Sequence, residues 1–159
     1  MKSKICSVGL KNEEQDLVSK LTTRSGSNHS TLSIVGMKGV GKTTLAKLVY
    51  YNKDVVEHFP VRVWVTVTEG AVNKSKVLLM KKDRTKDQTL NLMEVCDHMT
   101  EKLCLVVLDN VSKMTDFYEL HGKLSGSQWT NGSRIVLTTR FKDVAFHANN
   151  NSTSTPHHI

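Results

Sequence analysis

The sequence contains few prolines, cysteines and aromatic residues, and each scarcity excludes a class of protein. With 2 prolines and 9 glycines in 159 residues, it is neither collagen-like nor a low-complexity disordered chain. Its 3 cysteines are odd in number and lack metal-ligand spacing, which argues against a disulfide framework or a zinc site. No apolar run approaches the ~18 residues of a membrane span, and no signal peptide is evident. We therefore expect a cytoplasmic protein of ordinary globular composition.

Positive charge exceeds negative charge, with a formal net charge of +7. Residues 74–86 form a local basic cluster in which Asp83 is the single acidic residue. Its basic residues are Lys74, Lys76, Lys81, Lys82, Arg84 and Lys86. Such a cluster could bind nucleic acid or an acidic partner. No aromatic residues interleave for base stacking, so a solvated loop and helix face is the favoured interpretation. Nucleic-acid binding is therefore not expected.

Strand and helix signals alternate along the chain. Apolar and β-branched runs predict strands at 31–35, 61–67, 103–108 and 133–138, and helical spacing predicts helices at 43–51 and 85–102. The 103–108 run has no polar residue, as expected for a strand buried on both faces. Strands separated by helices indicate parallel pairing in an α/β sheet that is covered on both faces.

Three segments of different character are expected along the chain. Residues 1–30 would form a segment that precedes the first strand and packs on the rest, and residues 31–148 would form the α/β domain itself. The polar stretch at 149–159 is typical of a mobile tail that begins a truncated element.

A phosphate-binding loop is predicted between the first strand and the helix that follows it. Residues 36–43, GMKGVGKT, match the pattern G-x-x-x-x-G-K-[ST]. Glycines let backbone N–H groups turn toward phosphates, and the helix N-terminus adds its dipole. Lys42 would contact the β- and γ-phosphates, and Thr43 would offer a hydroxyl to Mg²⁺. The expected nucleotide-binding residues here are Gly36, Met37, Lys38, Gly39, Val40, Gly41, Lys42, Thr43 and Thr44.

An aspartate follows the buried 103–108 run, in the position of the second support that a phosphate loop needs. Asp109 would hold Mg²⁺ directly or through water, so Thr43 and Asp109 are the expected metal ligands. In many ATPases the next residue is a second acid that activates the attacking water, but here it is Asn110. An amide can orient water but cannot take its proton. Asp109 and Asn110 are thus the catalytic candidates, neither of them firm, and we expect at best a weak P-loop ATPase.

Together these motifs resemble the NB-ARC family, the nucleotide-binding domains of plant intracellular disease-resistance proteins. The resemblance covers nearly the whole chain and includes residues 8–14 (VGLKNEE), 59–69 (FPVRVWVTVTE) and 132–140 (GSRIVLTTR). Val8 and Gly9 match a segment that lies along the adenine, and Arg140 matches an arginine that faces the terminal phosphate. Trp64 points to the coiled-coil class of these receptors.

The resemblance implies a fold, a function and partners. The fold would be a three-layer P-loop NTPase with four to five parallel strands, helices on both faces and strand order 2-3-4-1-5, the fifth strand beginning near His157. The function would be that of an ADP/ATP switch in a plant immune receptor, with Mg²⁺ as cofactor and nucleotide exchange controlling defence activation. The partners would be the coiled coil, the ARC subdomains and leucine-rich repeats of that receptor, with self-association in the active state.

The sequence departs from the family pattern in three places. Asn110 replaces the second acid, and Ser112 stands where a tryptophan often follows. The family's downstream Gly-x-Pro and Met-His-Asp segments are absent, so we expect the nucleotide-binding subdomain alone, with weak affinity. Two alternatives stay open. One is an active P-loop ATPase or nucleotide kinase, which a catalytic acid or an arginine-rich lid would favour. The other is a basic interaction module for nucleic acid or protein.

Overall fold

The structure, a computed structural model, describes residues 10–22, 31–37, 39–67, 76–81, 88–89, 103–118, 134–148 and 157–159. Its strands are β1 (Thr31–Val35), β2 (Val61–Thr66), β3 (Lys76–Lys81), β4 (Gln88–Thr89), β5 (Cys104–Asp109), β6 (Arg134–Thr139) and β7 (His157–His158). Its helices include α2 (Lys11–Thr22), α3 (Lys42–Tyr50), α4 (Lys53–His58) and α7 (Lys142–Ala148). None of these helices has both the length and the apolar character needed to cross a membrane.

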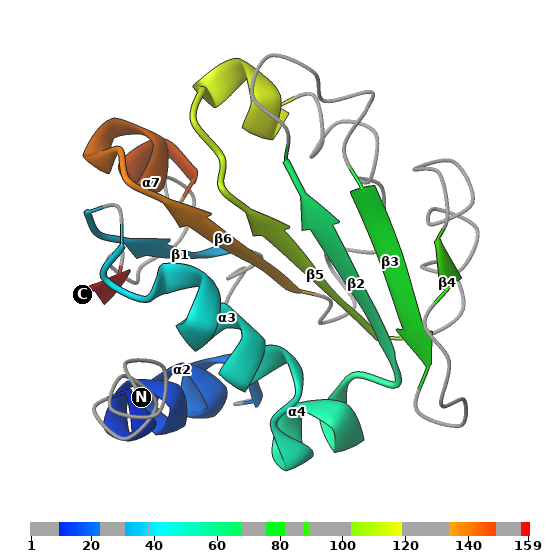
Figure 1. Cartoon of the computed structure of the whole chain (residues 1–159). Coiled ribbons are helices and arrows are strands. Elements are labelled where there is room, and N and C mark those ends of the chain that lie inside the picture. Colours follow the sequence, from blue (N-terminus) through cyan, green and yellow to red (C-terminus); the bar gives the residue numbers. More distant parts are fainter. Residues whose placement is uncertain are drawn as a thin grey trace.

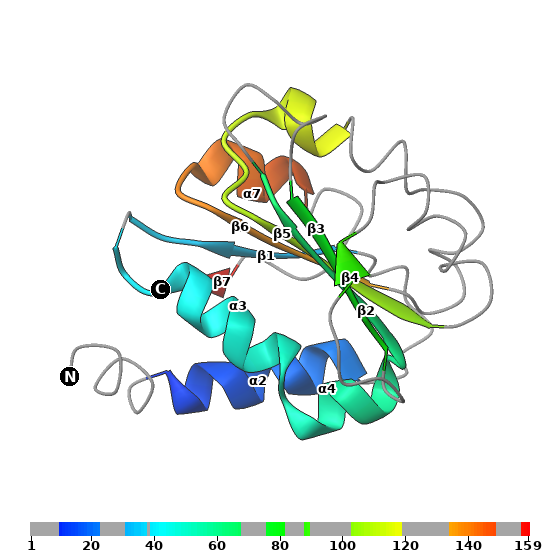
Figure 2. The same ribbon diagram turned by 45° about the vertical axis from the view of Figure 1, so that its right-hand side comes forward.

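The described strands form one sheet in the order β4-β3-β2-β5-β6-β1-β7. The strands β2, β5, β6, β1 and β7 are neighbours in this order and are parallel to one another. They correspond to the predicted strands 2, 3, 4, 1 and 5, with the fifth near His157, so the predicted order 2-3-4-1-5 is confirmed. Helices α2, α3 and α4 lie on one side of this sheet and α7 on the other (Figures 1 and 2). The P-loop NTPase architecture inferred from the sequence is therefore confirmed.

Two antiparallel strands extend the sheet beyond β2, and the sequence reading missed both. β3 pairs with β2, and β4 pairs with β3. The interpretation of residues 74–86 as a loop and helix face is therefore wrong for residues 76–81, and the helix predicted over 85–102 is wrong at residues 88–89. The other residues of that predicted helix lie outside the described part of the chain. Pairing with β3 satisfies the backbone groups along the outer edge of β2, a tertiary effect that local charge does not reveal.

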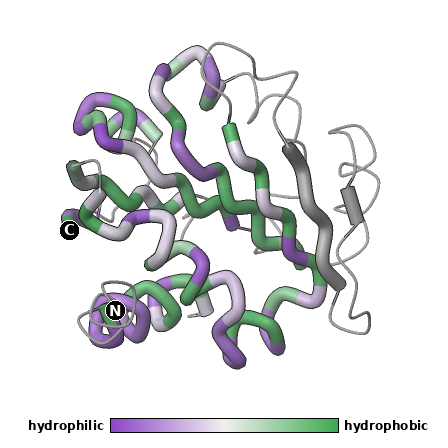
Figure 3. Tube along the Cα trace, viewed as in Figure 1, coloured by the Kyte–Doolittle hydropathy of each residue, from purple (hydrophilic) through white to green (hydrophobic). Residues whose placement is uncertain are grey.

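The parallel strands are buried on both faces because their side chains alternate between two hydrophobic clusters. Val63 and Val106 belong to the cluster that includes Val144 of α7, whereas Trp64 and Val107 belong to the cluster beneath α2, α3 and α4. This is the period-two alternation of a strand. Figure 3 shows predominantly hydrophobic residues along the central strands. The carboxyl ends of these strands are therefore fixed in position by the packing of the apolar residues that precede them.

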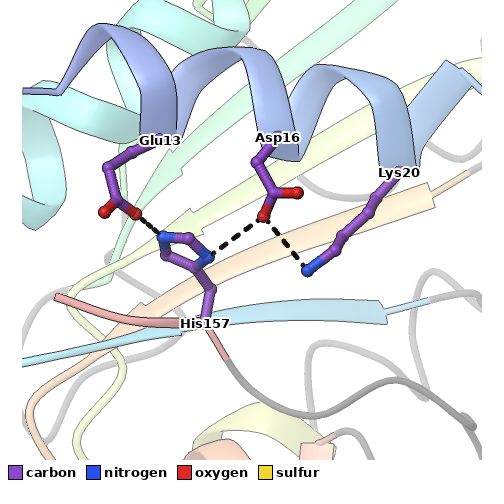
Figure 4. Close-up of polar contacts among 4 residues, drawn as sticks. All are labelled: Glu13, Asp16, Lys20 and His157. Carbon is purple, nitrogen blue, oxygen red and sulfur yellow. Dashed lines mark hydrogen bonds and ion pairs between the residues drawn. The ribbon is translucent and has the colours of Figure 1, made fainter.

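The last described strand, β7, pairs with the edge of β1 that faces away from β6, and its side chain His157 contacts α2. The His157 imidazole contacts the Glu13 carboxylate, and its Nδ1 lies 3.7 Å from the Asp16 carboxylate (Figure 4). The backbone N–H of Ile159 donates to Val35 at 3.0 Å. Segments 144 residues apart in sequence are therefore joined beside the point where β1 ends.

Candidate functional site

The loop that joins β1 to α3 is shaped by glycines in two different ways. Gly39 and Gly41 have φ angles of +86° and +101°, a left-handed conformation that glycine adopts without strain. Gly41 is also the N-cap of α3, directly before its first residue. Apart from Gly39 and its chain neighbours, no atom of the described residues lies within 4 Å of the place where a Cβ of Gly39 would be. The backbone at Gly39 is therefore open to the close approach of a ligand.

Gly36, by contrast, is needed because its surroundings leave no space for a side chain. A Cβ there would lie 2.8 Å from the Ile159 carbonyl oxygen and 2.8 Å from a Val40 methyl group. The Gly36 N–H also donates to the Thr139 carbonyl at 3.2 Å. The start of the loop is thus held against β6 and against the residue that follows β7.

A cavity of about 570 Å³ opens between this loop and the carboxyl ends of the parallel strands. Its volume lies in the range of about 300–1,000 Å³ that is usual for ligand pockets. In α/β sheets, this edge is where ligands bind. The cavity is lined by Gly39, Gly41, Lys42, Thr43, Thr44, Thr66, Asp109, Asn110, Val111, Ser112, Thr138, Arg140 and Phe141.

Lys42 lines the cavity with its ammonium group held by the loop itself. Its Nζ donates to the Met37 carbonyl at 2.8 Å. Partial burial lowers the pKa of the Lys42 ammonium, Asp109 opposes this effect, and Arg140 reinforces it. Burial is the largest of these causes, and it disfavours the charged form of the group, so an anion bound beside the ammonium would counteract the decrease in pKa.

The Asp109 carboxylate, at the end of β5, receives hydrogen bonds from two hydroxyl groups. Thr43 Oγ1 lies 3.0 Å from Oδ1 and 3.1 Å from Oδ2, and Thr138 Oγ1 lies 2.6 Å from Oδ1. The two expected metal ligands, Thr43 and Asp109, are thus in direct contact. Hydroxyl and carboxylate oxygens are the hard ligands that Mg²⁺ prefers, so this donor set fits that ion.

An unsatisfied hydroxyl also fits a polar ligand in the cavity. The Ser112 oxygen is covered from solvent and has no hydrogen-bond partner among the described residues, although Ser112 lines the cavity. Buried polar groups are normally hydrogen-bonded. Because this oxygen is covered, a ligand in the cavity would reach it only after a local rearrangement.

Arg140 and Asn110 follow the ends of β6 and β5. The Arg140 guanidinium lies 4.8 Å from the centre of the Phe141 ring, and both residues line the cavity. Asn110 has a φ angle of +71°, which asparagine tolerates better than most residues. Its N–H donates to Thr138 Oγ1 at 2.8 Å. The turns after both strands therefore present polar groups to the same space.

The structure brings most of the predicted site residues together. Eight line the cavity, namely Gly39, Gly41, Lys42, Thr43, Thr44, Asp109, Asn110 and Arg140. Gly36, Met37 and Val40 belong to the loop without lining the cavity, and the Met37 side chain is 77% exposed. Val8, Gly9 and Lys38 lie outside the described residues.

Sequence reasoning overlooked the polar residues at the strand ends as parts of the site. Thr66 on β2 and Thr138 on β6 line the cavity beside Asp109, and Val111, Ser112 and Phe141 complete its wall. A signal was present, because hydroxyl residues at the carboxyl ends of predicted parallel strands meet at one edge of the sheet.

Comparison with known proteins agrees with the motifs and the geometry. The family description "NB-ARC domain" matches residues 10–159. "Putative disease resistance RPP13-like protein 2" of Arabidopsis thaliana is 34% identical over 149 residues, which cover 87% of this chain and 17% of that protein. "Disease resistance protein RPP13" of the same plant is 32% identical over 152 residues, which cover 87% of this chain and 18% of that protein.

A relative from another plant points the same way. "Putative late blight resistance protein homolog R1B-14" of Solanum demissum is 30% identical over 149 residues, which cover 89% of this chain and 11% of that protein. The chain therefore spans less than a fifth of the length of these relatives. With the phosphate loop, the parallel sheet and the cavity between them, the chain belongs to the NB-ARC family of nucleotide-binding domains.

Proposed function

We propose that this chain is the ADP/ATP-binding switch domain of a plant intracellular immune receptor, in which nucleotide exchange controls defence activation. The observation that carries the proposal is the cavity that Lys42, Thr43, Asp109 and Arg140 share. The resistance proteins among its relatives supply the biological setting. The remaining receptor domains, self-association in the active state and a cytoplasmic location belong to the same proposal.

Nucleotide phosphates would be held by the loop backbone and by Lys42. The open space beside Gly39 admits a phosphate group close to the backbone, and the N-terminus of α3 favours negative charge. The Lys42 ammonium donates to a loop carbonyl, so it needs only to change its acceptor to contact a phosphate. Thr43 and Asp109 would hold Mg²⁺, which neutralises phosphate charge when bound.

Slow hydrolysis follows from the absence of a free base in the described part of the cavity. Asp109 is the only carboxylate among the described residues that line it, and that carboxylate accepts hydrogen bonds from Thr43 and Thr138. Asn110 cannot accept a proton from water in its place. The site therefore favours holding nucleotide over cleaving it, as a switch requires.

Arg140 would report the terminal phosphate. Its guanidinium rests on the exposed side of the cavity against Phe141, and its charge reaches Lys42, because it contributes to the lowered pKa of that ammonium. A γ-phosphate would attract both cations, whereas ADP would leave Arg140 on the aromatic ring. Movement of Arg140 would then carry the nucleotide state to the rest of the receptor.

The test is to identify the nucleotide that the protein carries. Purified protein is denatured, and the released small molecules are identified by mass spectrometry. ADP and ATP binding is then measured by calorimetry for this chain and for a version extended through the downstream Gly-x-Pro region. We expect adenine nucleotide in the released fraction and tighter binding by the longer chain. Release of no nucleotide, together with no ADP or ATP binding by either version, would contradict the proposal.

A further inference from the structure

A buried hydroxyl on β6 holds the carboxylate to which the metal ion would bind. Thr138 is only 1% exposed, and its hydroxyl donates to Asp109 Oδ1 at 2.6 Å. The same oxygen accepts the N–H of Asn110 at 2.8 Å. One side chain therefore contacts both the carboxylate and the turn that follows it.

The two hydroxyl groups that donate to Asp109 belong to different parts of the fold. Thr43 belongs to the helix that follows the phosphate loop, and its single proton is shared between two carboxylate oxygens at 3.0 and 3.1 Å. Thr138 lies within the sheet, because β6 pairs with β5 on one side and with β1 on the other. Its hydrogen bond to Asp109 is also the shorter one. The orientation that Thr138 imposes is thus independent of the loop.

The end of β6 also supports the turn that carries Arg140. Thr138 and Thr139 face opposite sides of the sheet, as neighbouring residues of a strand do. The Thr139 hydroxyl accepts the N–H of Phe141 at 3.1 Å. Thr138 is thus the hydroxyl that contacts the carboxylate, and Thr139 is a buried hydroxyl one residue away with a different partner.

We propose that Thr138 is a positioning residue that orients the Asp109 carboxylate toward a divalent cation. It thereby sets how strongly Mg²⁺ enhances nucleotide binding. This inference rests on the proposed nucleotide-binding function. Because Thr138 reaches the cation through Asp109, its loss weakens binding in the presence of Mg²⁺ more than binding in its absence.

The test compares Mg²⁺-dependent with metal-free nucleotide binding. ADP affinity is measured by calorimetry with Mg²⁺ and with EDTA for the wild type, Thr138→Val, Thr138→Ser and the control Thr139→Val. Partners that orient metal ligands typically contribute 10–100-fold to metal affinity. We expect Thr138→Val to reduce the enhancement by Mg²⁺ about tenfold, so that affinity falls more with Mg²⁺ than with EDTA. Thr138→Ser restores the enhancement, and Thr139→Val leaves it intact.

A double variant tests whether Thr138 affects Mg²⁺ through the Asp109 carboxylate. In Asp109→Asn, adding Thr138→Val changes the Mg²⁺ enhancement no further, because the group that it positions has been removed. Thr138→Ala repeats the comparison if the valine variant unfolds. An undiminished enhancement in Thr138→Val or Thr138→Ala overturns the inference, and so does equal weakening with Mg²⁺ and with EDTA. A wild type that binds no nucleotide under either condition overturns the proposed function itself, and the inference with it.

Discussion

The two walls of the cavity are built from different parts of the chain and from different atoms. The loop wall consists of Gly39, Gly41, Lys42 and Thr43, and the described backbone of the loop is shaped by Gly36, Gly39 and Gly41. The strand-end wall consists of side chains from separate strands. Asp109 of β5 and Thr138 of β6, for example, are joined by a hydrogen bond between their side chains. The loop wall therefore tolerates little change in backbone conformation, whereas the strand-end wall depends on individual oxygen atoms.

The largest expected effect is a gain of hydrolysis at the strand-end wall. Asn110→Asp places a carboxylate beside the proposed metal site, and aspartate tolerates the positive φ angle found there. We expect single-turnover ATP hydrolysis to rise about 100-fold with little change in ADP affinity. The measurement belongs in a longer version of the chain that includes the downstream subdomains.

Asn110→Gly is the matched control, because glycine accepts the same backbone conformation without supplying a base. Normal binding of ATP and Mg²⁺ without any gain in Asn110→Asp would show either that the base lies elsewhere or that the protein cycles by nucleotide exchange rather than by hydrolysis.

The next effect removes the charge of the loop wall. Lys42→Ala is expected to weaken ADP binding about 10–100-fold, the range for a hydrogen bond to a charged group. The free energy of unfolding stays nearly constant, because the hydrogen bond that the Lys42 ammonium donates to a described residue goes to a loop carbonyl and not to the core. Lys47→Ala, on the same helix, serves as the control. Unchanged ADP affinity in Lys42→Ala would refute the phosphate-loop assignment.

The pH dependence of binding tests the same ammonium. Because burial lowers the pKa of Lys42 below 10.5, its charge is lost at a lower pH than that of an exposed lysine. ADP affinity should therefore decline as pH rises through this lowered pKa. Lys42→Arg, which keeps its charge in that range, should bind more weakly at neutral pH but show no such decline. Parallel pH profiles for wild type and Lys42→Arg would contradict this account.

The glycines of the loop wall separate two kinds of constraint. At Gly36 the obstacle is space, so Gly36→Ala should cost about 1–3 kcal/mol of unfolding free energy and Gly36→Asn more. At Gly39 the obstacle is the positive φ angle, so Gly39→Ala should cost about 1–2 kcal/mol and Gly39→Asn less. Urea unfolding of the four variants measures this. If the same substitution, alanine or asparagine, were the more destabilising one at both positions, the distinction between limited space at Gly36 and the positive φ angle at Gly39 would be wrong.

The smallest effect concerns the apolar body of β5. Burial raises the pKa of the Cys104 thiol to about 12, so it should resist alkylation at pH 8 until the protein unfolds. Above the ordinary thiol pKa of 9.0, ionisation favours the unfolded chain, and this contribution to stability falls as pH rises toward about 12. Peptide mass spectrometry after iodoacetamide treatment checks the first point. Rapid labelling of Cys104 in the folded protein would contradict its placement.

The predicted fold depended on patterns that are local in sequence. The apolar run at 103–108 predicted β5, and the helix predicted at 43–51 appears as α3 at Lys42–Tyr50. β3 was missed because Lys76 and Lys81 drew attention to charge, while its antiparallel pairing with β2, the strand directly before it in the chain, cannot be recognised from residues 76–81 alone. Local patterns thus identified the parallel core, and the added edge strands required tertiary information.

The predicted site shows the same division. The phosphate loop is one continuous motif, so its residues could be named from the sequence. Thr66 and Thr138 lie near the carboxyl ends of predicted strands, which indicates the correct edge of the sheet, but their places beside Asp109 depend on the register of β2, β5 and β6. The contact of His157 with Glu13 likewise joins residues 144 positions apart. The backbone wall of the cavity was therefore predictable, and much of its side-chain wall was not.

The most direct test of the account is a crystal structure of this chain with ADP and Mg²⁺. We expect density for the diphosphate along the loop between Gly39 and Thr43, contacted by the Lys42 ammonium. We also expect the cation to lie beside the hydroxyl of Thr43 and the carboxylate of Asp109. A diphosphate bound away from this loop, or a cation without Asp109 in its first or second coordination sphere, would contradict the central claim that both walls serve one nucleotide site.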